Sequence, residues 1–210
     1  MYLYGASGHA KVIIDILKAV GESINGLIDD NPEVEQLQGY AVEHGYSGQT
    51  PLIISIGSNF VRKKIAERIG ANYGTAIHPS AIVSPTARIG EGSVVMQGAI
   101  VQTEVNIGRH CIINTGASVD HECRIEDYVH VSPHATLCGN VSVGEGTWVG
   151  AGSTIVQGVT IGKWSVIGAG TVVARNVPDG VLVVGDRIQR IRDITPEILN
   201  KLNRGGKLSK

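Results

Sequence analysis

An aliphatic side chain recurs at every sixth position from Ile77 to Val173 without interruption. The repeating positions are Ile77, Val83, Ile89, Val95, Val101, Ile107, Ile113, Val119, Ile125, Val131, Leu137, Val143, Val149, Ile155, Ile161, Ile167 and Val173. A helix repeats its faces every ~3.6 residues and a strand every second residue, so neither element alone produces this spacing. A fixed repeat that runs this long predicts a coiled chain in which each turn packs on the next.

Small or β-branched residues stand two positions before these aliphatic residues, as at Ala81, Ser93 and Ala117. This alternation places both sets of side chains on the inward side of a strand, and the small ones suit a narrow interior. Cys111 and Cys123 fall in the small series, so we interpret them as core residues. Glycine follows several of the aliphatic residues, where we expect tight corners with positive φ: Gly90, Gly108, Gly144, Gly150, Gly162 and Gly168.

The repeat resembles the hexapeptide repeat of the left-handed β-helix acyltransferases, in which three hexapeptides form one triangular coil. At about 18 residues per coil and ~4.8 Å between stacked strands, the repeat predicts slightly more than five coils. We therefore predict a left-handed parallel β-helix acyltransferase domain over residues 75–184. The resemblance further implies a homotrimer with active sites between neighbouring subunits.

The last part of the chain leaves the repeat. Residues 181–184 are expected to form a closing strand, and residues 185–210 a turn, a short helix over 195–202 and a tail. Three arginines here either face the phosphates of coenzyme A or form a solvated basic edge: Arg187, Arg190 and Arg192.

Residues 1–74 have a different pattern, that of a small open α/β domain. Apolar strands are expected at residues 2–4, 24–28 and 52–56, with a helix after the first strand and another after the third. The first strand runs into the glycine loop GASGHA, where free backbone N–H groups and the helix dipole favour a phosphate. We predict a half-Rossmann-like fold, although Gly5 and Gly8 are also explained by a tight strand-to-helix turn.

The order of GASGHA, the segment IDD, the segment SIG and the hexapeptides resembles the bacterial UDP-4-amino-sugar N-acetyltransferases and their sialic acid O-acetyltransferase relatives. Asp29 and Asp30 stand about 20 residues after the glycines, where an acidic partner for a ribose or base is expected. The resemblance implies that the N-terminal domain binds a nucleotide-linked amino sugar, with UDP as the expected nucleotide. The residues that match substrate-binding positions are Ser7, Gly8, His9, Asp29, Asp30 and Gly57.

Among the seven histidines, His121 has the strongest case for catalysis. It stands two residues after the inward Val119, at a corner of the predicted coil, and is followed by Glu122. Acetyl transfer from a thioester needs a base for the acceptor's proton, and a neighbouring carboxylate can orient an imidazole for that work. A solvated corner histidine is the alternative from the residues alone, whereas the resemblance implies that His121 is the general base and Glu122 its partner.

The resemblance also assigns residues that bind acetyl-CoA, the expected co-substrate. His130 matches a histidine that contacts the thioester region, and Ala151 and Ala169 match positions where the pantetheine arm passes along exposed backbone. Asn114 is expected to orient the acceptor substrate or the cofactor. Direct transfer in a ternary complex is the predicted mechanism, because the inward phase of Cys123 argues against a covalent acetyl-enzyme.

Charge and composition exclude other classes of protein. The formal net charge of -1 gives no basic surface for nucleic acid, and no apolar run reaches the ~20 residues of a membrane span. Since residues 1–8 also lack a positive segment followed by a long apolar stretch, we expect a cytoplasmic protein. Three cysteines without CxxC spacing indicate neither a disulfide framework nor a zinc site, so no metal is expected. A sialic acid O-acetyltransferase, a metal-dependent hydratase on the same fold and a non-enzymatic scaffold stay open as alternatives, as do the sugar and the nucleotide base.

Overall fold

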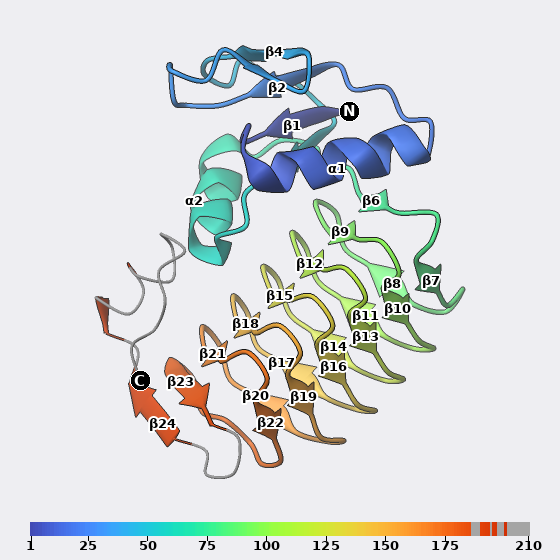
Figure 1. The fold of residues 1–210 in the computed structure, drawn as a ribbon, viewed down its shortest axis with the longest axis vertical. Helices are drawn as coiled ribbons and strands as arrows, with labels where there is room; N and C mark the ends of the chain where they lie inside the picture. Colours follow the sequence, from blue (N-terminus) through green and yellow to red (C-terminus); the bar gives the residue numbers. More distant parts are fainter. Residues whose placement is uncertain (186–189, 194, 197–199, 201–210) are drawn as a thin grey trace.

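The computed structural model describes residues 1–185, 190–193, 195–196 and 200. Within this part of the chain, an α/β domain lies against the side of a parallel β-helix (Figure 1). The predicted fold class, an N-terminal α/β domain followed by a left-handed β-helix, is confirmed. The predicted helix over residues 195–202 falls largely outside the described residues, as do Arg187 and the side chains of Arg190 and Arg192.

The N-terminal domain is one sheet with two helices. Its strands lie in the order β3-β4-β2-β1-β5, in which β1 pairs in parallel with β2 and β5, β4 pairs in parallel with β2, and β3 is antiparallel to β4. The elements are β1 (Tyr2–Tyr4), α1 (Gly8–Ala19), β2 (Gly26–Ile28), β3 (Gln36–Leu37), β4 (Tyr40–Glu43), β5 (Leu52–Ile54) and α2 (Asn59–Ile69). The hairpin of β3 and β4 was not predicted, because its short strands are half exposed and carry polar residues.

The β-helix has three faces. Face 1 consists of β6 (Ala76–Ile77), β9 (Val94–Val95), β12 (Ile112–Ile113), β15 (His130–Val131), β18 (Trp148–Val149) and β21 (Val166–Ile167). Face 2 consists of β7 (Ile82–Val83), β10 (Ile100–Val101), β13 (Ser118–Val119), β16 (Thr136–Leu137), β19 (Thr154–Ile155) and β22 (Val172–Val173). Face 3 consists of β8 (Arg88–Ile89), β11 (Asn106–Ile107), β14 (Arg124–Ile125), β17 (Ser142–Val143) and β20 (Thr160–Ile161).

The stacking of these strands agrees with the predicted number of coils. Each strand pairs in parallel with the strand three further along, so that Ser118 lies beside Ile100 and Thr136 beside Ser118. Face 3 has five strands and face 2 has six, which gives slightly more than five coils. The predicted closing strand is β23 (Val181–Val184), which extends face 1 beside β21, and β24 (Arg190–Asp193) pairs with it antiparallel.

The inward side chains of the repeat form one continuous core. From Val95 to Val173 the aliphatic positions are almost fully buried, as are Cys111 and Cys123 of the small series. The first three aliphatic positions of the repeat, Ile77, Val83 and Ile89, are only partly buried, because no coil covers them from the N-terminal side. The hexapeptide pattern therefore predicted the core side chains residue by residue.

The expected role of the corner glycines was wrong. Positive φ falls three residues after each aliphatic position from Ile89 to Ile167, at Gly92 and also at non-glycine residues such as Glu104, rather than at the glycines that directly follow the aliphatic residues. Those glycines are required by close approach instead: a Cβ atom on Gly90 would lie 2.6 Å from the carbonyl carbon of Gly108 in the next coil. Stacked coils approach too closely here for any side chain.

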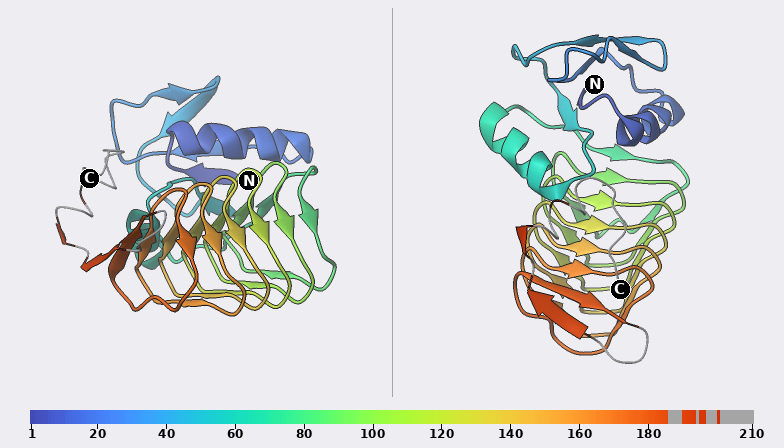
Figure 2. Two further views of the ribbon diagram at one scale, coloured as in Figure 1. Left: turned by 60° about the horizontal axis from the view of Figure 1, so that its bottom comes forward. Right: turned by 60° about the vertical axis from the view of Figure 1, so that its left-hand side comes forward.

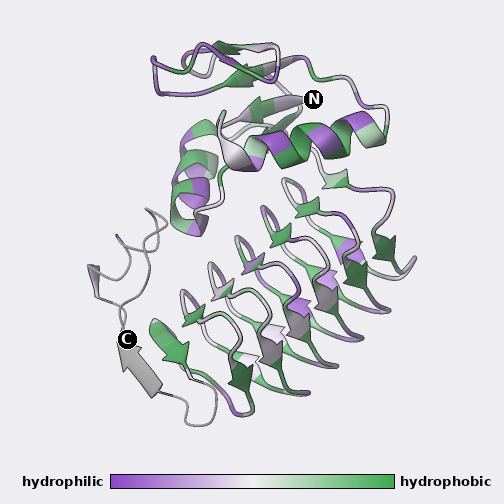
Figure 3. Ribbon diagram, in the orientation of Figure 1, coloured by the Kyte–Doolittle hydropathy of each residue, from purple (hydrophilic) through white to green (hydrophobic). Residues whose placement is uncertain are grey.

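The N-terminal domain covers face 1 and one of its edges. Helix α1 packs its apolar side, including Ile13 and Leu17, against the outward residues Val94 and Ile112 in one buried cluster. The face 1 strands beneath α1 are hydrophobic, as their colour in Figure 3 shows. Helix α2 lies along the edge between faces 3 and 1 (Figure 2). The glycine loop at the start of α1 is thereby brought to the outer surface of face 1.

Candidate active site

His121 lies on the edge between faces 2 and 3, in the turn that joins β13 to β14. Its Nδ1 is 3.0 Å from Oε2 of Glu122, and both side chains are about half exposed. If Nδ1 carries the proton donated to Glu122, the lone pair on Nε2 is free to accept a proton from a substrate. The backbone N–H of His121 donates to Oδ1 of Asp120 at 2.8 Å, a contact that sequence reasoning missed.

The surroundings of His121 fix both members of the pair. Glu122 occupies the left-handed corner position of its coil, with φ of 60°. Gly139 in the next coil lies beneath the imidazole, and a Cβ atom there would come within 2.5 Å of Cε1 of His121. Glu122 thus shares its left-handed backbone with the equivalent corner residues of other coils, and a glycine at 139 leaves room for the imidazole.

His130 and Asn114 meet on the outer surface of face 1. The distance between Nδ2 of Asn114 and Nε2 of His130 is 3.0 Å. An amide nitrogen only donates, so Nε2 of His130 accepts and its proton lies on Nδ1. Burial, together with the nearby positive charge of Arg62 and with His9, holds the pKa of His130 well below its usual range. His130 is therefore a neutral imidazole with an N–H left to donate.

Trp148 supports His130 from the next coil. The two rings are stacked with centroids 5.8 Å apart and planes 3° apart, and Nε1 of Trp148 donates to Oγ of Ser132 at 2.6 Å. Sequence reasoning did not link these residues to the site. The signal was available, because Trp148 follows His130 by one coil in the parallel register of face 1.

The glycine loop brings His9 to the same place. Ser7 is the N-cap of α1 but makes no side-chain cap, and His9 lies in the first turn. Burial, followed by the charge of Arg62, lowers the pKa of His9 to about 4, and its Nε2 has no hydrogen-bond partner among the described residues. A Cβ atom on Gly8 would meet no atom within 4 Å, so the loop borders open space. His9, Asn114 and His130 thus belong to one cluster.

Asp29 and Asp30 follow β2 and have different contacts. Asp29 accepts from the backbone N–H groups of Ala6 at 2.7 Å and Asn31 at 2.9 Å, so it holds the glycine loop in shape. Asp30 accepts from the hydroxyl of Tyr4 and from Nη2 of Arg68 at 2.9 Å. The Tyr4 hydrogen bond is the main cause that lowers the pKa of Asp30.

The remaining predicted residues lie at two other places. Gly57 follows β5, beside the glycine loop, and a Cβ atom on it would also meet open space. Ala151 and Ala169 are exposed on the edge between faces 1 and 2, in consecutive coils joined by the hydrogen bond from Gly170 N to Ala151 O at 2.8 Å. They form a strip of open backbone that begins one coil beyond His130.

Comparisons with known proteins agree with this arrangement. Residues 1–69 match the family model of the PglD N-terminal domain, and residues 140–175 match that of the bacterial transferase hexapeptide (six repeats). The solved structure of a mutant perosamine N-acetyltransferase from Caulobacter crescentus, in complex with CoA and GDP-perosamine, is 39% identical. The match covers 92% of this chain and 96% of that one, with a TM-score of 0.87. The chain belongs to the PglD-like hexapeptide-repeat N-acetyltransferases.

Two further relatives support the membership of this PglD-like acetyltransferase. The acetyltransferase domain of PglB from Neisseria gonorrhoeae is 34% identical, with 91% of this chain and 98% of that one covered and a TM-score of 0.84. The UDP-N-acetylbacillosamine N-acetyltransferase of Bacillus subtilis is 42% identical over 111 residues, which is 45% of this chain and half of that relative's length. The family expected from the sequence is confirmed.

The predicted site residues of this PglD-like chain lie in two separate places. His9, Gly57, Asn114 and His130 lie on or beside face 1, whereas His121 lies on the edge between faces 2 and 3. In a three-sided prism this edge is opposite face 1. One copy therefore does not bring His121 to the glycine loop or to His130.

The described residues were searched for metal-binding groups and for membrane-spanning helices. No group of three or more His, Cys, Asp or Glu side chains there could hold a metal ion. Neither described helix is long and apolar enough to cross a membrane.

Proposed function

We propose that this PglD-like acetyltransferase transfers the acetyl group of acetyl-CoA to the amino group of a nucleotide-linked amino sugar. The observation that carries the proposal is the match over nearly the whole length of the perosamine enzyme, whose structure holds CoA and GDP-perosamine. In this proposal residues 1–74 bind the nucleotide sugar, residues 75–184 bind acetyl-CoA and supply the base, and residues 185–210 complete the C-terminal end. One relative is named for a GDP sugar and another for a UDP sugar, so both nucleotides are candidates.

The proposed chemistry is direct transfer in a ternary complex. The amine nitrogen of the sugar attacks the thioester carbonyl carbon while Nε2 of His121 takes the proton from that nitrogen. The tetrahedral intermediate collapses with cleavage of the C–S bond, and the imidazolium returns a proton to the leaving sulfur of coenzyme A. Glu122 holds Nδ1–H and stabilises the imidazolium. The N–H on Nδ1 of His130 is suited to donate to the thioester region.

A covalent acetyl-enzyme is not supported by the cysteines nearest to His121. Burial raises the pKa of the Cys123 thiol to about 11, and the side chain is fully buried in the core. A thiol that stays protonated and lacks access to a substrate is a poor nucleophile. Cys138 is half exposed, but the proposed chemistry assigns it no role.

A homotrimer is part of this proposal, because one sugar must reach residues that lie on opposite sides of a single copy. The outward row of face 2, which borders the His121 edge, is uncharged and includes Ile82 with 66% of its surface exposed. Such a row suits contact with a second copy. Ala151 and Ala169, at the edge between faces 1 and 2, are placed for the pantetheine arm. The cytoplasmic location stays a prediction.

The test is an acetyl-transfer assay that measures release of free coenzyme A thiol. Purified protein is given acetyl-CoA with UDP-linked or GDP-linked amino sugars, or with free sialic acid. We expect turnover with a nucleotide amino sugar and at least a ~1,000-fold loss of kcat in His121→Ala. Turnover with sialic acid alone, or full activity of His121→Ala, would refute the proposal.

A further inference from the structure

The fully buried side chain of Arg62 connects the N-terminal domain to the β-helix. It lies on α2, only 1% of its surface is exposed, and its acceptors are four carbonyls and one side-chain amide. Nε donates to His110 O at 2.7 Å; Nη1 donates to Ile56 O at 2.9 Å and Gly57 O at 3.2 Å; Nη2 donates to Asn59 Oδ1 at 2.9 Å and Tyr128 O at 3.0 Å. All five donors of the guanidinium are therefore used.

The acceptors of Arg62 belong to separate parts of the molecule. Ile56 and Gly57 form the loop after β5 that borders the predicted nucleotide-sugar site. His110 and Tyr128 are corner residues of two consecutive coils, both with positive φ. At these corners the backbone N–H bonds the preceding coil, and the carbonyl is left for α2. Arg62 thus joins the loop of the nucleotide-sugar site to two coils at once.

Asn59 extends the same connection to a third coil. Its Nδ2 donates to Gly146 O at 3.0 Å and Thr147 O at 3.2 Å, while its Oδ1 accepts from Arg62. The start of α2 is therefore fixed to three stacked coils through directional hydrogen bonds. Directional hydrogen bonds set the position of the Gly57 loop on the β-helix, which apolar packing alone does not do.

Burial of the charge of Arg62 is unfavourable in free energy, which indicates that Arg62 has a role other than stabilising the fold. None of its described partners is a carboxylate, and burial lowers its pKa to about 10, so the side chain is still charged at neutral pH. Apolar residues often stabilise a fold as well as a buried charge does. The same charge also reaches His9 and His130, whose pKa values it helps to lower.

We propose that Arg62 is a positioning residue: it fixes the Gly57 loop on the β-helix and so aligns the bound nucleotide sugar with the acetyl-donor residues of face 1. The inference rests on the proposed function, because it assigns the Gly57 loop to the nucleotide sugar. Arg62 touches neither substrate in this account. It acts through the carbonyls of Ile56 and Gly57.

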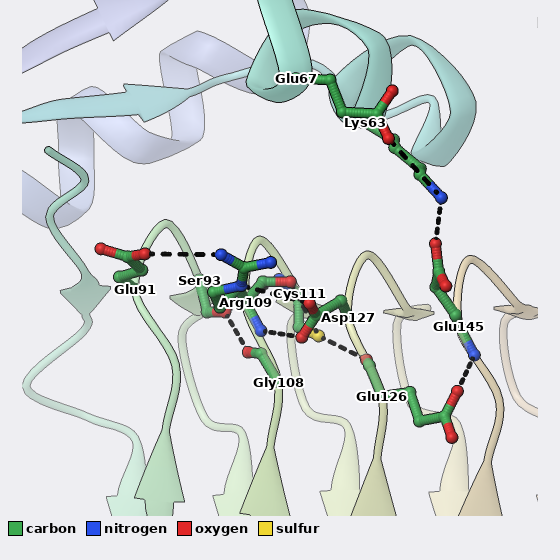
Figure 4. A network of polar contacts seen from close by, with 10 residues as sticks. All are labelled: Lys63, Glu67, Glu91, Ser93, Gly108, Arg109, Cys111, Glu126, Asp127 and Glu145. Carbon is green, nitrogen blue, oxygen red and sulfur yellow. Dashed lines mark hydrogen bonds and ion pairs between the residues drawn. The ribbon is translucent and has the colours of Figure 1, made fainter. Parts of the chain in front are cut away.

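A neighbouring contact supplies the matched control. Lys63 follows Arg62 on α2 and forms ion pairs with Glu145 of the β-helix and with Glu67 of α2 (Figure 4). Within the described part of the chain, neither ion pair involves the Gly57 loop. Lys63→Met therefore removes the ion pair between α2 and the β-helix, while the hydrogen bonds from Arg62 to the carbonyls of Ile56 and Gly57 remain. Ile155→Val serves as a second control, which weakens the core on a different face.

The experiment compares Arg62→Lys and Arg62→Met with these controls. Arg62→Lys keeps the charge but loses the fork of donors, whereas Arg62→Met removes the charge and every donor. For both variants we expect KM for the nucleotide sugar to rise about tenfold or more, with KM for acetyl-CoA within about twofold of wild type. Hydrogen exchange at residues 55–59 should be faster, while the amides of the β-helix strands keep their protection. The controls should leave both KM values unchanged.

Two results would overturn the inference. One is an unchanged KM for the nucleotide sugar in Arg62→Lys. The other is a rise in that KM of equal size in Lys63→Met or Ile155→Val, which would indicate a general loss of stability. Wild-type protein that transfers no acetyl group would refute the proposed function instead, and hydrogen exchange at residues 55–59 would then still report whether Arg62 fixes the loop.

Discussion

The contact between Glu122 and His121 decides which imidazole nitrogen faces a substrate. Glu122→Gln keeps the size of the side chain but removes the charge that stabilises the imidazolium during transfer. We expect kcat to fall about 10–100-fold, the usual effect of losing an orienting partner, with KM for acetyl-CoA unchanged. Steady-state kinetics of thiol release measures both values.

Glu104 offers a matched control for that substitution. It occupies the same corner position one coil earlier, with φ of 58° against 60° at Glu122. Glu104→Gln should therefore have the kcat of wild type. If Glu122→Gln also kept full activity, Glu122 would have no part in the reaction.

Gly139 tests how precisely the imidazole must be held. An added Cβ atom would come within 2.5 Å of Cε1 of His121, and φ at Gly139 is not in the left-handed region, so Ala fits the backbone but displaces the ring. We expect Gly139→Ala to lower kcat about 100-fold, because small misplacements of a catalytic group are costly. A thermal melt should show a native fold. Activity equal to wild type would mean that the ring position does not matter.

At the residue scale, the sequence allowed some contacts to be predicted and not others. The period of six identified which side chains face inward, and the adjacency of His121 and Glu122 implied their contact. The hydrogen bond from Ala6 N to Asp29 and those from Arg62 to His110 O and Tyr128 O join residues far apart in the chain. No spacing encodes such contacts, because the first depends on how β1 and β2 pair and the others on how the two domains pack.

At the scale of elements, the junction of α2 with the β-helix should make stability depend on pH. His110 lies between the rings of Tyr73 and Tyr128, and burial, then the charges of Arg62 and Arg109, lowers its pKa from 6.5 to about 4. Between pH 6.5 and about 4, the imidazole of His110 is therefore protonated in the unfolded chain but neutral in the folded one. Stability is present above pH 6.5 and is lost as pH falls toward 4.

Melting temperatures across this pH range test the effect. We expect Tm of the wild type to fall by several degrees as acidity increases, and to fall less steeply in His110→Asn. Asparagine tolerates the left-handed backbone at this corner and does not titrate. The slope of Tm against pH is compared rather than Tm itself, because the substitution also removes ring stacking and so lowers Tm at every pH. Equal slopes would show that His110 does not contribute.

The elements themselves were largely predictable where they are apolar. The strands of the β-helix, β1, β2, β5 and both described helices followed from hydrophobic pattern, whereas the polar hairpin of β3 and β4 did not. The face that α1 covers had a readable signal. Outward positions on face 1 are apolar at Val94 and Ile112, while those on face 3 include Arg88 and Arg124.

At the scale of the whole molecule, the proposed chemistry requires that copies share each site. His121 on one edge and Asn114 on the opposite face cannot serve one sugar in the same copy. A chain that carries His121→Ala and a chain that carries Asn114→Ala should therefore each be inactive, yet complement one another in mixed oligomers. This property was implied only by resemblance at the level of sequence, because the repeat does not reveal which edge faces another copy.

Acetyl transfer by such mixed oligomers shows whether His121 of one copy acts with Asn114 of another. The two chains are co-expressed with different tags, purified through both, and assayed with acetyl-CoA and the nucleotide amino sugar that the wild type accepts. In a trimer that contains both chains, one of the three interfaces has both intact residues, so we predict about a third of wild-type activity. Mixed oligomers that are assembled but as inactive as either single variant would contradict a site shared between copies with His121 as its base.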